Sequence, residues 1–281
     1  MHRRQITDAD IGAVADLLAE GFRRSTRQNW LNIFAKLSTH NTPSGFPKYG
    51  YLMESKGVPV AAILVVSSLM HMNGVARVRC NLSSWYVSPA FRSYGPLFIS
   101  GALKSTDVTY INVSPAPHTL AILQVQGFSR YSDGQFLAFA TPFTPSGGAR
   151  VELVTGELAL PFGAAEQELL RAHARYGCMS LWCAVGDEAF PFVFRPRTLR
   201  GLLPCCQLIY CRNIQEFVRF AKPIGRFFAR RGRPLIMIDA NGPIPGLSGK
   251  YVDGFLPKYF KGAERPSLGD LAFTETALFG I

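Results

Sequence analysis

The chain has 281 residues, of which 48% are hydrophobic and 17% charged, which is typical of a globular protein that folds in water. The formal net charge of +11 favours anionic partners. Lys and Arg are scattered, however, and we recognise no nucleic-acid-binding module, so charge alone selects no function. No secretory signal follows Met1, and the apolar run from Val58 to Met70 is too short to span a bilayer. We therefore expect a cytoplasmic protein without a membrane span.

The first half of the chain predicts two helices, a strand meander and then alternating helices and strands. Thr7 and Asp10 have the spacing of a capping box before the first helix, and Asn73-Gly74 is a strong hairpin signal. The predicted elements are, in chain order, helices over 11–18 and 29–37, strands over 51–55, 60–66 and 76–87, a helix over 96–104, a strand over 108–113, a helix over 118–126 and a strand over 135–141.

A second domain is predicted after a linker rich in Pro and Gly at residues 142–149. The length of the chain agrees with two domains of ordinary size, which we place at residues 1–145 and 150–281. The elements expected in the second half are a helix over 166–174, strands over 179–184, 189–194 and 206–211, a helix over 214–231 and a strand over 235–239.

The two halves have matching patterns at one constant offset, with no gap. Residues 81–87 align with 208–214, and residues 108–113 with 235–240. At the same offset Arg92 matches Arg219, and Pro96 matches Pro223. Because the order of elements is preserved, the pattern predicts a duplicated domain. Proline is a preferred first helical residue, so we expect both prolines to start a helix.

The stretch from Ser88 to Phe98 lies between a predicted strand and a predicted helix. A helix N-terminus has unpaired amides and a partial positive charge, so it can hold a phosphate group. Arg92 would add a charged contact, and Gly95 would let the backbone approach the anion. Pro96 removes one amide donor, at a cost of about 1 kcal/mol. The stretch therefore has three possible interpretations: a working anion site, the remnant of such a site, or a simple turn.

Residues 1–140 resemble the GNAT superfamily of acyl-coenzyme A acyltransferases. Residues 85–89 resemble the end of the family's central strand, residues 92–97 its pyrophosphate loop, and residues 118–128 its late helix ending in Gly-Phe. The resemblance implies an α+β fold with a mixed, mostly antiparallel sheet flanked by helices, in two tandem copies. It implies acetyl-coenzyme A or another acyl-coenzyme A as co-substrate and no metal. The residues it assigns to coenzyme binding are Trp85, Tyr86, Val87, Arg92, Ser93, Tyr94, Gly95, Leu97 and Phe98.

The family's usual catalytic groups are absent from their usual places. Leu123 stands where a tyrosine commonly protonates the leaving thiolate, and residues 81–87 contain no carboxylate. Three other groups are candidates: His118, which titrates near neutral pH, Ser114, as a relay through water, and Tyr86. Each has a plainer interpretation, as a capping or exposed histidine, a turn serine, and a tyrosine that faces the core. In some duplicated members of the family the C-terminal carboxylate acts as the base, and the apolar end of this chain is compatible with that role.

The function expected from the resemblance is direct acyl transfer to an amine or hydroxyl acceptor, either a small molecule or a peptide. The alternative is a catalytically inactive relative that binds acyl-coenzyme A or a partner without turnover. The interpretation of the chain as a nucleic-acid-binding protein depends on net charge alone, and we expect no nucleic-acid partner. A monomer and a homodimer are both compatible with the sequence. The six cysteines lack the spacing of a zinc site and predict buried, reduced thiols.

Overall fold

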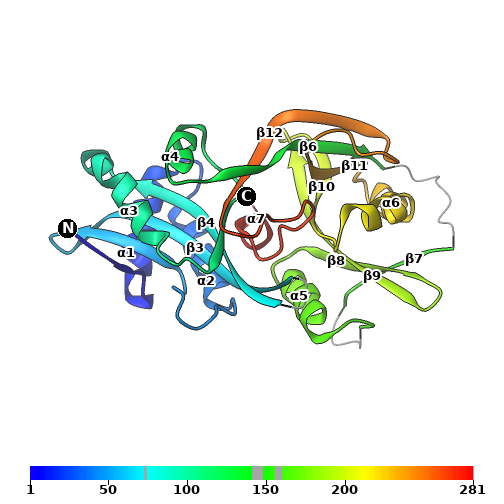
Figure 1. Cartoon of the computed structure of the whole chain (residues 1–281), viewed down its shortest axis with the longest axis horizontal. Helices are drawn as coiled ribbons and strands as arrows, with labels where there is room; N and C mark the ends of the chain where they lie inside the picture. Colours follow the sequence, from blue (N-terminus) through cyan, green and yellow to red (C-terminus); the bar gives the residue numbers. More distant parts are fainter. Residues whose placement is uncertain (73–74, 141–147, 156–159, 281) are drawn as a thin grey trace. The chain divides into compact units, whose positions relative to one another are not determined.

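A computed structural model describes residues 1–72, 75–140, 148–155 and 160–280. The predicted turn at Asn73-Gly74 and most of the predicted linker lie outside these residues. The chain forms two compact units, which are described separately. Unit 1 comprises residues 1–129 and 259–265, and unit 2 comprises residues 130–258 and 266–281 (Figure 1). The return of residues 259–265 to unit 1 was not predicted.

Unit 1 follows the predicted order of helices and strands, with an additional first strand. A 3₁₀ helix, η2 (Pro89–Tyr94), runs directly into α3. The other elements are β1 (His2–Gln5), η1 (Asp8–Asp10), α1 (Ile11–Gly21), α2 (Arg27–Ser38), β2 (Gly50–Ser55), β3 (Val58–Met72), β4 (Val75–Val87), α3 (Gly95–Ala102), β5 (Val108–Asn112), η3 (Pro117–Thr119) and α4 (Leu120–Val125).

The helix α1 begins where the sequence predicts, and α2 begins two residues before the predicted start at residue 29. The backbone N–H of Thr7 donates to Asp10 Oδ2 at 2.8 Å, which forms the expected capping box. Asp10 also accepts from Arg4 at 2.7 Å, so the box is tied to β1. Thr26 Oγ1 accepts from the N–H of Asn29 at 3.2 Å and caps α2.

The helices of unit 1 cover opposite faces of its sheet. Ala61, Ile63 and Val65 of β3 pack in a core with residues of α3 and α4. Their neighbours in β3 point to the other face because strand side chains alternate, and α1 packs on that side against β3 and β4. Strands are neighbours in the order β1-β2-β3-β4-β5, and the last residues of β12 (Gly249–Lys261) add beside β5 (Figure 1).

Unit 2 repeats this plan with one long helix over its sheet. Its strands are neighbours in the order β12-β6-β11-β10-β9-β8-β7. A core of aromatic residues, including Phe192, Phe217 and Phe228, lies between this sheet and α6. The elements of unit 2 are β6 (Ser129–Phe139), β7 (Arg150–Leu153), α5 (Ala164–Arg175), β8 (Met179–Val185), β9 (Glu188–Leu199), β10 (Leu203–Tyr210), α6 (Ile214–Ala229), β11 (Leu235–Ala240) and α7 (Glu275–Leu278).

The strand register agrees with the repeat seen in the sequence. In unit 1 the parallel pairing of β4 and β5 begins at Val78 opposite Val108. In unit 2 the parallel pairing of β10 and β11 begins at Cys205 opposite Leu235, which is the same pair displaced by the offset of the repeat. The predicted fold class, a mixed and mostly antiparallel sheet flanked by helices, is confirmed.

The expected role of the matched prolines is wrong for Pro223. The helix α6 begins at Ile214 and runs through Pro223, which is buried in its interior. Asn213 caps this helix by accepting from the N–H of Glu216 at 2.8 Å. Pro96 does lie in the first turn of α3, where it follows Gly95. The two prolines therefore occupy different positions in their helices.

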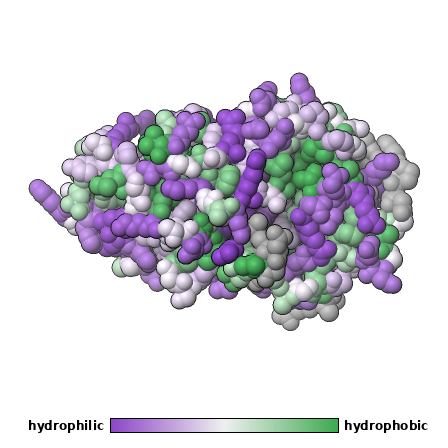
Figure 2. All heavy atoms as spheres, viewed as in Figure 1, coloured by the Kyte–Doolittle hydropathy of each residue, from purple (hydrophilic) through white to green (hydrophobic). Residues whose placement is uncertain are grey.

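The surface and the cysteines agree with the composition. Hydrophilic residues are spread over the face shown in Figure 2, as the scattered Lys and Arg suggest. Within the described residues, no helix is both long and apolar enough to cross a bilayer. All six cysteines are buried and free, and burial raises the pKa of the Cys80 thiol to about 11. The prediction of buried thiols is confirmed.

The stability of unit 1 should depend on the protonation of His40. This buried side chain lies 2.8 Å from the carbonyl of Ser67 and 3.1 Å from Ser68 Oγ, both through Nε2. Burial lowers the pKa of His40 below its ordinary 6.5, so the unfolded chain takes up the proton first. We expect the unfolding free energy to fall as pH drops below about 6.5, by at most about 1.4 kcal/mol per pH unit from this group.

Denaturant unfolding between pH 7.5 and 5 would measure this effect. The His40→Gln variant keeps an N–H donor for the Ser67 carbonyl and cannot titrate in this range. Its unfolding free energy should therefore vary less with pH than that of the wild type. Identical pH profiles for the two proteins would contradict the assignment.

Candidate functional site

The central strands of unit 1 separate near their carboxyl ends. The pairing of β4 with β5 runs to Asn81 opposite Ile111 and stops there, although β4 continues to Val87. Asn81 Nδ2 donates to the carbonyls of Leu82 at 3.1 Å and Ile111 at 3.4 Å, one on each strand. We call this parting of the strands the fork. As a result, the pairing with β5 does not extend along residues 84–87, the last residues of β4.

A β-bulge in β4 lies beside the fork. Ser83 is opposite Leu64 of β3, whereas Tyr86 is opposite Ala62, so β4 has one more residue than β3 in this interval. Ser84 has a φ of 49°, in the left-handed region that serine seldom adopts. Bulges and residues of this kind are concentrated near binding and catalytic sites. The local geometry therefore marks the end of β4 as a candidate site.

Trp85 and Tyr86 point to opposite faces of the sheet. Trp85 packs on the core shared with α3, and a Cβ built on Gly95 would lie 3.5 Å from its ring. Tyr86 lies on the side of α1, where its hydroxyl donates to Glu20 Oε1 at 3.0 Å. The structure thus places the Tyr86 ring on the α1 face, and its role in catalysis stays a prediction. The end of β4 presents a side chain to each face.

The predicted pyrophosphate loop forms η2 and the first turn of α3. Arg92, Ser93 and Tyr94 are exposed. Gly95 has an ordinary helical φ of −52°, and its N–H donates to the carbonyl of Arg92. This amide is thus already engaged, so a bound phosphate would depend on the other groups of η2 and on the Arg92 guanidinium.

The last two residues assigned to coenzyme binding differ in burial. Leu97 is 72% exposed, whereas Phe98 is 2% exposed and packs in the core of unit 1. Val87 is half-buried and packs against the same core. Phe98 therefore supports the helix from inside, and Leu97 is available to a ligand at the surface.

The other catalytic candidates lie beyond the end of β5. Ser114 is exposed and follows the strand by two residues. His118 is exposed in η3, which leads into α4. Leu123, in the position where the family commonly has a tyrosine, is fully buried in the core. The structure thus assigns Leu123 to packing. The structure also brings Tyr86 together with Glu20, a residue that the sequence does not indicate as part of a site.

The described residues of unit 2 contain no counterpart of this site. Only three residues, 211–213, separate β10 from α6, so the stretch matching Val87–Tyr94, residues 214–221, is part of a helix. The edge of β10 is also used by its own unit. The N–H of Cys211 donates to the carbonyl of Gly269 at 2.9 Å, and the N–H of Leu271 donates to the carbonyl of Ile209 at 2.7 Å. The C-terminal segment therefore fills the position next to β10.

Two further expectations concern a metal ion and the C-terminal carboxylate. Among the described residues no cluster of His, Cys, Asp or Glu has the arrangement of a metal site. The C-terminal carboxylate belongs to Ile281, which lies outside the described residues, so its proposed role as a base stays a prediction.

Comparison with known proteins agrees with the fold. No family model and no curated protein matches the sequence. A GCN5-related N-acetyltransferase from Anabaena variabilis superposes with a TM-score of 0.62 at 9% identity, over 92% of this chain and 72% of that one. One from Kribbella flavida gives a TM-score of 0.55 at 14% identity, over 92% and 70%. The chain therefore has the fold of the GCN5-related N-acetyltransferases.

Proposed function

We propose that unit 1 binds acyl-coenzyme A along the edge of β4 and transfers the acyl group to an acceptor. The observation that carries this proposal is the fork, which removes β5 from the edge of β4 between Ser84 and Val87. An extended ligand with amide groups can bind such an edge as an added strand would. Arg92 and the exposed part of η2 follow directly and would receive the phosphate groups.

The contrast with unit 2 supports the choice of unit 1. In unit 2 the corresponding edge of β10 is hydrogen-bonded to residues 269–271, and a helix replaces the phosphate loop. Glu216 is in the first turn of that helix, and a carboxylate there opposes the binding of an anion. Because of this difference between the units, we expect each chain to bind one molecule of coenzyme.

The reaction would be a direct transfer. The acceptor nitrogen or oxygen attacks the thioester carbon, the carbon–sulfur bond breaks, and the thiolate takes up a proton. A backbone N–H near the bulge of β4 would stabilise the negative charge that develops on the carbonyl oxygen. The cysteines have no role in this scheme, because all six are buried.

A catalytically inactive acyl-coenzyme A binder is the second candidate. It is favoured by Leu123, which is buried where the family commonly has a tyrosine, and by the Gly95 amide, which is already bonded within η2. The two candidates share the coenzyme site and differ only in turnover.

Calorimetric titration with acetyl-coenzyme A and a longer acyl-coenzyme A tests the site that both candidates share. We expect a single binding site per chain. Two equivalent sites would contradict the assignment to unit 1, and the absence of binding would contradict both candidates. Thiol release measured with a panel of amines and alcohols then separates them, because the inactive binder releases none.

A further inference from the structure

A carboxylate and a phenol meet on the α1 face of unit 1, at the end of β4. Glu20 comes from the last turn of α1 and is exposed, and Tyr86 comes from the strand. The Tyr86 hydroxyl donates to Glu20 Oε1 at 3.0 Å. This pair lies on the face opposite Trp85 and the α3 core.

The chain is shaped to hold Tyr86 in this place. Gly21 follows Glu20, and a Cβ built on Gly21 would overlap the Tyr86 ring. The ring of Phe22 lies 6.5 Å from that of Tyr86, centroid to centroid, and closes the same side. The φ of Gly21 is not in the left-handed region, so the backbone itself does not require glycine here. The space is used by the ring.

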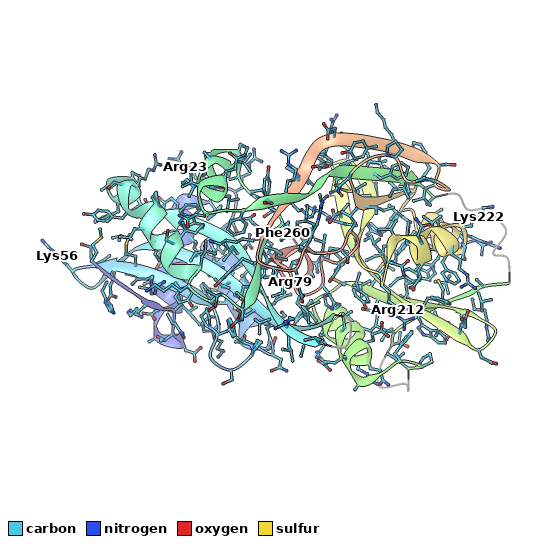
Figure 3. The ribbon with its side chains drawn as sticks, viewed as in Figure 1. Arg23, Lys56, Arg79, Arg212, Lys222 and Phe260 are labelled. Atoms are coloured by element: carbon cyan, nitrogen blue, oxygen red, sulfur yellow. The ribbon has the colours of Figure 1, made fainter. Side chains whose placement is uncertain are left out.

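The charges around Tyr86 come from three elements. Glu20 lies on α1, Arg23 on the loop that follows α1 (Figure 3), and Arg92 on η2. Burial raises the pKa of the Tyr86 phenol, and the hydrogen bond and charge of Glu20 raise it further, whereas Arg92 and Arg23 act in the opposite direction. The phenol therefore holds its proton at neutral pH.

We propose that Glu20 and Tyr86 form the acid–base pair of the transfer reaction and that the acceptor is an amine. This inference rests on the proposed function of unit 1. The exposed carboxylate attracts an ammonium group and accepts the proton that the amine must lose before attack. An alcohol carries no such charge, so Glu20 favours amines over hydroxyl acceptors.

The protons and bonds of this scheme balance. The ammonium group first loses one proton to the solvent through Glu20. The free amine then attacks the thioester carbon, the carbon–nitrogen bond forms as the nitrogen gives its second proton to Glu20, and the carbon–sulfur bond breaks. The Tyr86 phenol protonates the leaving thiolate, and Glu20 then returns a proton to Tyr86 along the hydrogen bond that joins them. The pair thus supplies both groups that are absent from residues 81–87 and from position 123.

Glu20→Gln and Tyr86→Phe test this role, each measured with an amine substrate and by titration with acyl-coenzyme A. General acid–base groups contribute about 10²–10⁴-fold to the rate, so we expect kcat of Glu20→Gln to fall by at least about 100-fold with unchanged coenzyme affinity. Glu20→Asp should recover part of this loss.

Asp16→Asn is the matched control, because Asp16 is an exposed carboxylate on the same helix, paired with Arg27 at 2.7 Å. It should keep wild-type turnover. Gly21→Ala should displace the Tyr86 ring and lower kcat while the coenzyme still binds. Turnover of Glu20→Gln within twofold of the wild type, or a wild type that acylates only alcohols, would overturn this inference alone. A wild type that binds no acyl-coenzyme A would overturn the proposed function with it.

Discussion

Asp239→Ala is expected to destabilise unit 2 by about 3–5 kcal/mol, because it leaves a buried lysine without its counter-charge. Lys258 Nζ lies 2.7 Å from Asp239 Oδ1, and both side chains are only 1% exposed. After the substitution the ammonium group would retain its hydrogen bond to the carbonyl of Leu256, at 3.1 Å, but would lack a counter-charge among the described residues. Thermal or denaturant unfolding measures the loss, which should appear as a markedly lower midpoint.

Two controls separate the charge from the packing at this position. The double variant Asp239→Leu with Lys258→Met removes both charges and should recover most of the lost stability. Glu168→Ala breaks an ion pair of the same length, 2.7 Å to Arg175, whose partners are 57% and 63% exposed. It should cost less than about 1 kcal/mol. Equal losses for Asp239→Ala and Glu168→Ala would show that burial of the pair has no energetic consequence.

The hydrogen bonds around Asp239 are distributed unevenly. Asp239 Oδ1 accepts from Lys258 and from Gln135 Nε2, the latter at 2.7 Å. Asp239 Oδ2 and Gln135 Oε1 are buried and have no protein donor within the described residues. Buried acceptors of this kind are ordinarily satisfied by an internal water molecule. The pair is therefore part of a polar network inside unit 2.

Arg92→Gln is expected to weaken the binding of acyl-coenzyme A by about 10- to 100-fold, which corresponds to the roughly 1.5–3 kcal/mol of a hydrogen bond to a charged group. Arg92 is exposed, and no ion pair is found for it within the described part of the chain. The substitution should therefore leave the melting temperature unchanged. Calorimetric titration measures the affinity, and added salt should reduce the difference between variant and wild type.

Arg219→Gln is the matched control for Arg92, because the two arginines occupy the same position in the repeat. Arg219 is part of α6, where it lies 3.7 Å from Glu188 and over the ring of Phe190. Lys222 on the same helix is exposed and points outward (Figure 3). If Arg219→Gln weakened coenzyme binding as much as Arg92→Gln, unit 2 would contain the site or share it.

The sequence predicted those parts of the site that depend on local signals. The end of β4, the turn with Arg92 and Gly95, and the helix that follows were placed from hydrophobic periodicity and from proline and glycine. The fork was not predicted, because Asn81 is one of several polar residues in β4 and gave no distinctive signal. The sequence allows the Tyr86 side chain to point to either face of the sheet, because alternation along a strand does not identify which face carries which helix. The bulge at Ser84 and the position of α1 decide this.

Glu20 could not have been found from its neighbours in the sequence. It lies in a helix whose apolar residues, such as Val14 and Leu18, define the buried face, and an exposed glutamate there is ordinary. Its partner Tyr86 is 66 residues away. The local sign was Gly21, because glycine is unfavourable within a helix. The structure gives the reason for this glycine: a Cβ at position 21 would overlap the Tyr86 ring.

The sequence by itself predicted most of the helices and strands, the offset of the repeat and the capping box, because each depends on residues that are close together in the chain or on a direct comparison of its halves. Tertiary structure decided what depends on distant partners. The strand β12 has Gly254 and Pro257 within it and shows no clean alternation, so its neighbours rather than its own sequence make it a strand. Pro223 is inside a helix because the chain in unit 2 has no long loop between β10 and α6. The edge of β10 is filled by residues 269–271, about 60 positions later in the chain, and that long-range pairing leaves β4 as the edge on which we place the coenzyme.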